Sequence, residues 1–110
     1  MAKELTVQEQ ANVRSCLEVL RAVQKNARTP GWFRGEVRGQ EAVGVAVATL
    51  QRKGLIQAGS GPQPFRLSKT GKDFVAENIK DWDAFMAKSS RPSTLEKIAK
   101  ALQRVSASGK

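Results

Sequence analysis

Leu50-Gln51-Arg52-Lys53-Gly54-Leu55-Ile56 joins the end of a predicted helix to the start of a predicted strand. Cations in the last turn and a glycine directly after it are typical of a helix C-terminus. The strand from Leu55 to Ala58 is followed by Gly59-Ser60-Gly61-Pro62-Gln63-Pro64, and Pro64 to Leu67 forms a second short apolar segment. Glycines and prolines between two such runs predict a hairpin. We therefore expect a mainly α fold with a small two-stranded β-hairpin.

The segment before the hairpin, Gln40 to Lys53, has two interpretations. Valines alternate in Val43-Gly44-Val45-Ala46-Val47, which taken alone indicates a strand. A helix would instead place four apolar side chains on one face: Val43, Ala46, Val47 and Leu50. The length of the segment and its C-terminal signals favour the helix. Gly44 counts against it, because an interior glycine costs about 1 kcal/mol relative to alanine, although its small size would permit a close approach of another backbone.

Two helices are expected ahead of this segment. Thr6 and Glu9 have the spacing of a capping box, so the first helix should run from Val7 to about Asn26. Its apolar positions recur at steps of three and four: Val13, Cys16, Leu17, Leu20 and Val23. Beyond the break at Thr29-Pro30-Gly31, a short second helix is expected from Trp32 to Gly39. Its expected core contacts are Trp32, Phe33 and Val37.

Two further helices are expected after the hairpin. The first spans Lys69 to Lys88 and carries a broad apolar stripe: Phe74, Val75, Ile79, Trp82, Phe85 and Met86. Ser93 and Glu96 form a second capping box, which predicts that Ser93 opens a final amphipathic helix. This last segment is rich in Lys and Arg. We divide the chain into a domain at 1–88 and a basic C-terminal helix with a frayed tail at 89–110.

The composition limits the kinds of function that this chain can have. The 110 residues hold 19 Lys and Arg against 10 Asp and Glu, a formal net charge of +9, which attracts polyanions such as nucleic acid or an anionic membrane surface. No apolar run is long enough to span a bilayer. The chain has no histidine and a single cysteine, Cys16, which we expect to be buried and inert. These counts argue against an enzyme, a metal site or a cofactor, and they agree with a cytoplasmic location.

The order of elements resembles the winged helix-turn-helix superfamily, with extra C-terminal helices. The residues that carry the resemblance are Leu50-x-x-Lys53-Gly54-Leu55-Ile56 and Leu67-Ser68-x-x-Gly71. They are similar to the strings L-x-x-K-G-L-I and L-T-x-x-G of small regulators of the MarR, ArsR and PadR kind. The resemblance covers roughly Val7 to Lys88. It implies a protein that binds double-stranded DNA, as a homodimeric transcriptional regulator in the cytoplasm or nucleoid.

In that superfamily the helix before the wing enters the major groove, so the resemblance assigns this role to Gln40 to Lys53. Its early exposed positions would then read bases: Gln40, Glu41, Gly44, Val45 and Ala48. They include few long hydrogen-bond donors, so contacts to bases should be weak. Six cations beside the helix and the wing are expected to contact phosphate: Arg28, Arg34, Arg38, Arg66, Lys69 and Lys72. The uncharged wing tip offers only Ser60 and Gln63.

Other partners stay open at this point. The helices from Lys69 to Lys88 and from Ser93 onward each carry an apolar stripe, which would suit a homodimer interface. An architectural, replication or partition factor is an alternative to a regulator, because the reading face is mostly apolar. The surface from Val45 to Ala48 could instead meet a protein, and the helix from Ser93 to Val105 could attach to a membrane surface.

Overall fold

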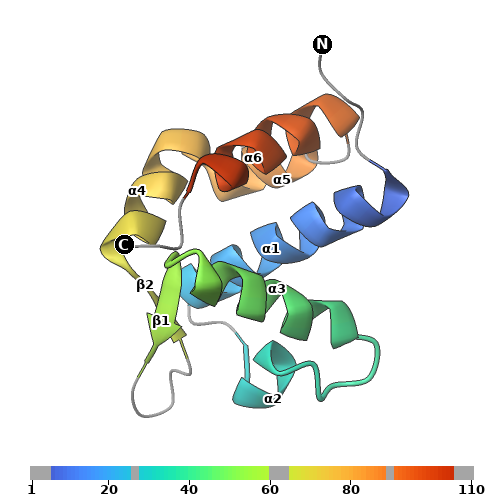
Figure 1. Ribbon diagram of the computed structural model, residues 1–110, viewed down its shortest axis with the longest axis vertical. Helices are drawn as coiled ribbons and strands as arrows, with labels where there is room; N and C mark the ends of the chain where they lie inside the picture. The colour runs from blue at the N-terminus through green and yellow to red at the C-terminus, as the bar shows by residue number, and fades with distance from the viewer. Residues whose placement is uncertain (1–5, 26–27, 60–64, 89–90, 106–110) are drawn as a thin grey trace.

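The computed structural model describes residues 6–25, 28–59, 65–88 and 91–105. Within them the chain forms six helices and one antiparallel hairpin, so the expected mainly α fold with a small two-stranded hairpin is confirmed (Figure 1). The elements follow in the order α1 Val7–Lys25, α2 Pro30–Phe33, α3 Glu41–Arg52, β1 Ile56–Ala58, β2 Phe65–Leu67, α4 Lys69–Asn78, α5 Trp82–Lys88 and α6 Pro92–Arg104.

Helix α1 is the central element of the core. Its capping box forms as predicted: the Glu9 amide donates to Thr6 Oγ1 at 3.1 Å, and the Thr6 amide donates to Glu9 Oε1 at 2.9 Å. The helix then packs against both α3 and α6. Leu17 and Leu20, at its middle, are fully buried. Because one helix supplies both contacts, residues of α6 belong to the same hydrophobic cluster as those of α3.

Helix α3 confirms the helical interpretation of the segment after Gln40. The face predicted to be apolar is buried: Val43, Ala46, Val47 and Leu50. Gly44 meets a neighbouring backbone, since a Cβ at this position would lie 3.1 Å from the carbonyl oxygen of Arg34. The missing side chain therefore lets α3 approach the turn that follows α2, which compensates for the low helix propensity of glycine.

The second helix is shorter than predicted and begins earlier. It spans Pro30 to Phe33, with Thr29 as its N-cap, and the chain then turns through Gly35 at a φ of 74°. Glycine adopts this left-handed conformation readily, and it ends the helix well before Gly39. Val37 consequently lies outside the helix and is 44% exposed, so its predicted place in the core is wrong.

The hairpin and α4 are tied together at Ser68. Ile56 pairs with Leu67, Gln57 with Arg66 and Ala58 with Phe65. Ser68 Oγ accepts from the Gly71 amide at 3.0 Å, which caps α4, and the same hydroxyl donates to the Gly54 carbonyl. The wing-tip candidates Ser60 and Gln63 lie outside the described residues.

The single helix expected from Lys69 to Lys88 is in fact two. Helix α4 ends at Asn78, and Ile79 takes an extended conformation. The Asp81 carboxylate then accepts from the amides of Asp83 and Ala84 at 3.0 and 3.3 Å, where α5 begins. Aspartate competes with helix continuation through such local bonds. The break lets both Ile79 and Trp82 reach the core.

Helix α6 begins one residue earlier than predicted, at Pro92, and no side chain caps it. Proline suits the first helical position, where its missing N–H costs nothing. Its apolar stripe faces the core, because Leu95, Ile98 and Leu102 are 0, 2 and 6% exposed. The stripes that suggested a homodimer are thus largely covered within one chain. The structure removes that reason for expecting a dimer.

The buried thiol gives a testable pH dependence. Cys16 is 5% exposed, and burial raises the pKa of its thiol from 9.0 to about 11. A raised pKa means that folding favours the neutral thiol, so the associated stability is complete below pH 9 and declines as the pH rises toward 11. In urea unfolding, the native protein should have a higher free energy of unfolding than Cys16→Ala, and this difference should shrink by about 1.4 kcal/mol per pH unit in that window. A constant difference would contradict the assignment.

Candidate nucleic-acid interface

One face of α3 is open to solvent along its length. Glu41, Val45, Ala48 and Arg52 are all exposed, at successive steps of four, three and four residues, and Val45 is 61% exposed. These steps place the four side chains in one row on the side of the helix opposite its buried face. We call these four residues the outer row of α3. It is acidic at its N-terminal end, apolar in the middle and basic at its C-terminal end.

Of the five residues that were expected to contact bases, three belong to the outer row: Glu41, Val45 and Ala48. Gln40 stands at the N-cap position and is half-buried. Gly44 faces the backbone of Arg34 rather than solvent. Sequence reasoning missed Arg52, which it treated only as a cation favourable for the end of a helix. The missed signal was spacing, since Arg52 follows Ala48 by four residues and Val45 by seven.

The turn between α2 and α3 holds one paired and one unpaired arginine. The Arg34 guanidinium donates to both Glu36 carboxylate oxygens, Nε to Oε1 at 2.8 Å and Nη2 to Oε2 at 3.1 Å. These hydrogen bonds, followed by the charge attraction, lower the pKa of Glu36 and raise that of Arg34. Arg38 is exposed and has no ion pair with any described residue. Arg38 is therefore the better placed of the two to bind an external anion.

Three cations lie in the hairpin and in the first turns of α4. Arg66 is exposed on the outer side of the hairpin, opposite Gln57. Lys69 and Lys72 are exposed in the first turns of α4, which has no acidic residue in its first turn. Cations at a helix N-terminus oppose the helix dipole, so these lysines do not stabilise the helix through it. Arg66 and Lys72 line the same hollow beside the end of α1, together with Val23, Gln24 and Leu67.

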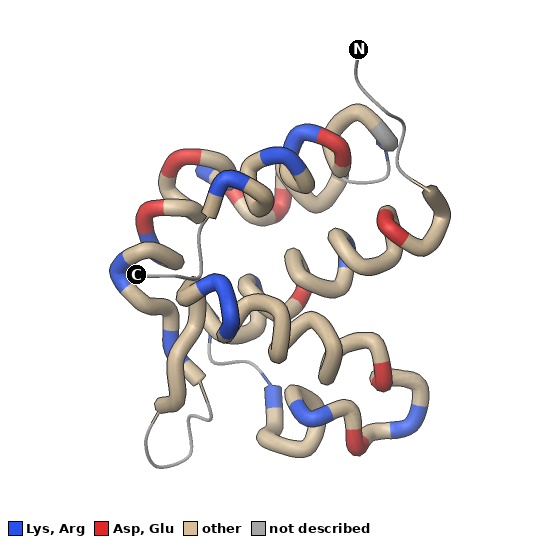
Figure 2. The backbone as a smooth tube through the Cα atoms, in the orientation of Figure 1, with Lys and Arg blue, Asp and Glu red and all other residues tan. Residues whose placement is uncertain are grey.

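Figure 2 shows basic residues at both ends of α3, at the base of the hairpin and at the start of α4. Two other cations make their contacts away from these positions. Lys53 Nζ donates to the Leu102 carbonyl of α6 at 3.0 Å, and the Arg28 guanidinium lies 5.0 Å from the centre of the Trp32 ring. The residues that remain available along the band are Arg38, Arg52, Arg66, Lys69 and Lys72. We call these five residues the basic band.

Among the described residues, no helix is both long and apolar enough to cross a bilayer. In the same parts of the chain, no three His, Cys, Asp or Glu side chains come together as metal ligands. Comparison of the chain with protein-family models, with curated proteins and with solved structures gave no match.

Proposed function

We propose that this chain is a winged-helix protein that binds double-stranded DNA. In this proposal α3 is the recognition helix and the β1–β2 hairpin is the wing. The observation that carries it is the uncovered outer row of α3, which has Arg38 just before it and Arg52 at its end. An exposed helix with cations at both ends can lie in a groove while its flanks contact the phosphates. Such a role would place the protein where DNA is, in the cytoplasm or nucleoid.

The charges favour a polyanionic partner. The net charge is +9, and none of the five residues of the basic band has an acidic partner within the described parts of the chain. Each can therefore neutralise a phosphate without first breaking an internal ion pair. Release of the counterions that such phosphates hold is the main source of affinity in non-specific DNA binding.

The outer row offers little for reading sequence. Arg52 is the one residue in the row that could bind guanine through two hydrogen bonds, and Val45 and Ala48 could only touch a thymine methyl. Glu41 would repel phosphates, although its carboxylate could accept a hydrogen bond from the amino group of cytosine. We therefore propose duplex binding carried mainly by the backbone, as in an architectural factor. Selection from random duplexes tests this: a recovered palindrome would instead indicate a dimeric regulator, as first expected from the resemblance.

Salt dependence is the first experiment. Fluorescence anisotropy with a labelled duplex should show binding at low salt. Between 50 and 200 mM salt the affinity should fall by roughly 10²-fold or more, as expected when about five phosphates are neutralised. If no duplex binding occurs at low salt, the proposed function is wrong. Binding that is strong but insensitive to salt would contradict the role of the basic band.

Glu36→Gln should tighten duplex binding. The substitution replaces one of the two oxygens that accept from Arg34 with an NH2 group, which cannot accept, and it removes a negative charge close to Arg38. We expect roughly a two- to fivefold gain in affinity at low salt, the size of one added phosphate contact. Glu77→Gln on α4 is the control, because it changes the net charge equally at an exposed position outside the turn that holds Arg34 and Arg38. Equal effects of both substitutions would show that only net charge matters.

A protein-binding role is the second candidate. It is favoured by the 61% exposure of Val45, which lines a hollow of about 130 Å³ between α1 and α3 together with Asn12, Cys16, Ala42, Ala46 and Thr49. Exposed aliphatic side chains beside a hollow can hold an apolar side chain of a partner. In this case duplex binding at low salt should be absent, so the salt experiment separates the two candidates.

A further inference from the structure

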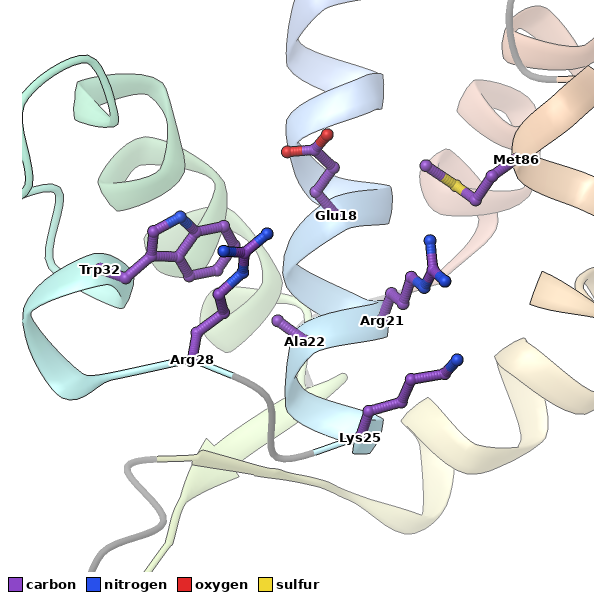
Figure 3. Close-up of a pocket in the computed structure, with 7 residues that line it drawn as sticks. All are labelled: Glu18, Arg21, Ala22, Lys25, Arg28, Trp32 and Met86. Atoms are coloured by element: carbon purple, nitrogen blue, oxygen red, sulfur yellow. The ribbon is translucent and has the colours of Figure 1, made fainter. Parts of the chain in front are cut away.

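A pocket opens on another side of α1, between α2 and α5 (Figure 3). Helix α1 supplies its floor, Arg28 and Trp32 stand on one side, and Met86 of α5 stands on the other. Its volume is about 340 Å³, which lies within the range of small-molecule sites. The residues that line it are Glu18, Arg21, Ala22, Lys25, Arg28, Trp32 and Met86.

The charge of this pocket is unbalanced. It holds three cations, Arg21, Lys25 and Arg28, against one carboxylate, Glu18. Arg21 is already held by Asp83, with Nη2 and Oδ1 3.0 Å apart. Lys25 and Arg28 have no acidic partner among the described residues. Two cations therefore remain to bind an anion that enters the pocket.

A buried ring holds the Arg28 guanidinium in place. The guanidinium carbon lies 5.0 Å from the centre of the Trp32 ring, a geometry in which the π-face attracts the cation. Trp32 is only 6% exposed, and it packs edge-on against Phe33 with ring centres 5.0 Å apart. The N–H groups of Arg28 can still donate, because stacking uses only the face of the guanidinium. Such preorganisation lowers the entropy lost when an anion binds.

We propose that this pocket binds a small organic anion. Its phosphate or carboxylate would pair with Lys25 and Arg28, and its apolar body would lie against Ala22 and Met86. Arginine binds both kinds of oxyanion through two parallel hydrogen bonds. Ala22 is buried in the floor and Met86 is half-buried, so the walls also give an apolar group a surface to cover.

This site is independent of the proposed DNA interface. Asn12 and Cys16 line the hollow beside α3, whereas Glu18, Arg21 and Lys25 line the pocket. At about 100° per residue, the two sets lie on opposite sides of α1. None of the five residues of the basic band lines the pocket. Anion binding can therefore be measured without DNA, and its failure would leave the proposed function untouched.

The test is a titration of the full chain followed by ¹⁵N–¹H NMR. Phenyl phosphate, benzoate and inorganic phosphate are added separately. We expect phenyl phosphate or benzoate to shift the Trp32 indole signal and the amides of Ala22, Lys25 and Arg28, with saturation. Whichever of the two binds more tightly identifies phosphate or carboxylate as the preferred group. Inorganic phosphate, which lacks the apolar body, should bind more weakly than phenyl phosphate.

Charge-matched variants decide whether the site is specific. Lys25→Ala and Arg28→Ala should each weaken binding by roughly tenfold, the typical value of a charge-assisted hydrogen bond. Lys97→Ala, in α6, and Arg91→Ala, just before α6, remove the same charge from exposed positions. Each should change the affinity for the anion by less than about twofold. Lys25 is exposed and forms no ion pair with any described residue, so Lys25→Ala should keep the native melting temperature. The proposal is overturned if Lys25→Ala matches Lys97→Ala, or if no saturable shift occurs up to about 10 mM.

Discussion

Gly71→Ala should strongly destabilise the protein. A Cβ at this position would lie 2.0 Å from the Leu55 carbonyl oxygen and 3.0 Å from its carbon. Both are backbone atoms, and the oxygen is held in place because it accepts from the Ser68 amide at 3.0 Å. We expect a loss of roughly 3 kcal/mol or more, the upper range for overpacking. In thermal unfolding this corresponds to a melting temperature lower by about 12 °C or more.

Gly31→Ala is the matched control. An added Cβ there would meet Glu36 Oε2 at 3.5 Å, an ordinary contact distance, and Gly31 lies within α2. Alanine is favoured over glycine in a helix by about 1 kcal/mol, so this variant should be neutral or slightly more stable than the native protein. If Gly71→Ala instead unfolds at the native temperature, α4 does not approach Leu55 as described.

Removing three arginines of the basic band should have the largest effect on DNA binding. The triple variant Arg38→Ala, Arg52→Ala and Arg66→Ala should lower duplex affinity at low salt by roughly 10²-fold, and should reduce the slope of log affinity against log salt by about 2.7, which is 0.9 for each lost phosphate contact. All three side chains are exposed and without ion pairs among the described residues. Anisotropy titrations at several salt concentrations measure both quantities.

A second triple variant separates location from net charge. Arg14→Ala, Arg91→Ala and Lys97→Ala remove the same charge from exposed positions on α1, beside the start of α6 and on α6. This control should lose at most a few-fold in affinity, through the weaker overall field. If both triple variants lose the same affinity and the same slope, the DNA does not contact the basic band.

The order of helices and strands could be predicted because local signals agree with tertiary packing. The Thr6 and Glu9 cap, the apolar face of α3 and the apolar runs around the hairpin each specify their element within a few residues. The structure of a segment can be predicted from its sequence when its local preference agrees with its tertiary packing. The break at Ile79 was missed because an apolar stripe continues through it in the sequence. It results from competing hydrogen bonds at Asp81, which periodicity does not register.

The candidate site was less predictable, because side-chain pairing depends on turns. Arg34 and Glu36 are two residues apart, and the Gly35 turn at a φ of 74° lies between them. The sequence predicted a helix here, in which residues two apart do not face each other. Likewise, Lys53 reaches α6 only because α3 and α6 pack on the same central helix. Whether the basic band binds DNA stays a prediction.

Chemical-shift mapping with duplex DNA would show which residues the DNA contacts. A ¹⁵N-labelled sample is titrated at low salt with a duplex of about 15 base pairs, long enough to span more than one helical turn. We expect the largest amide shifts at Arg38, along the outer row at Val45, Ala48 and Arg52, and from Arg66 to Lys72. If no shifts occur, or if they cluster on α6 while the outer row of α3 stays unchanged, α3 is not the helix that binds DNA.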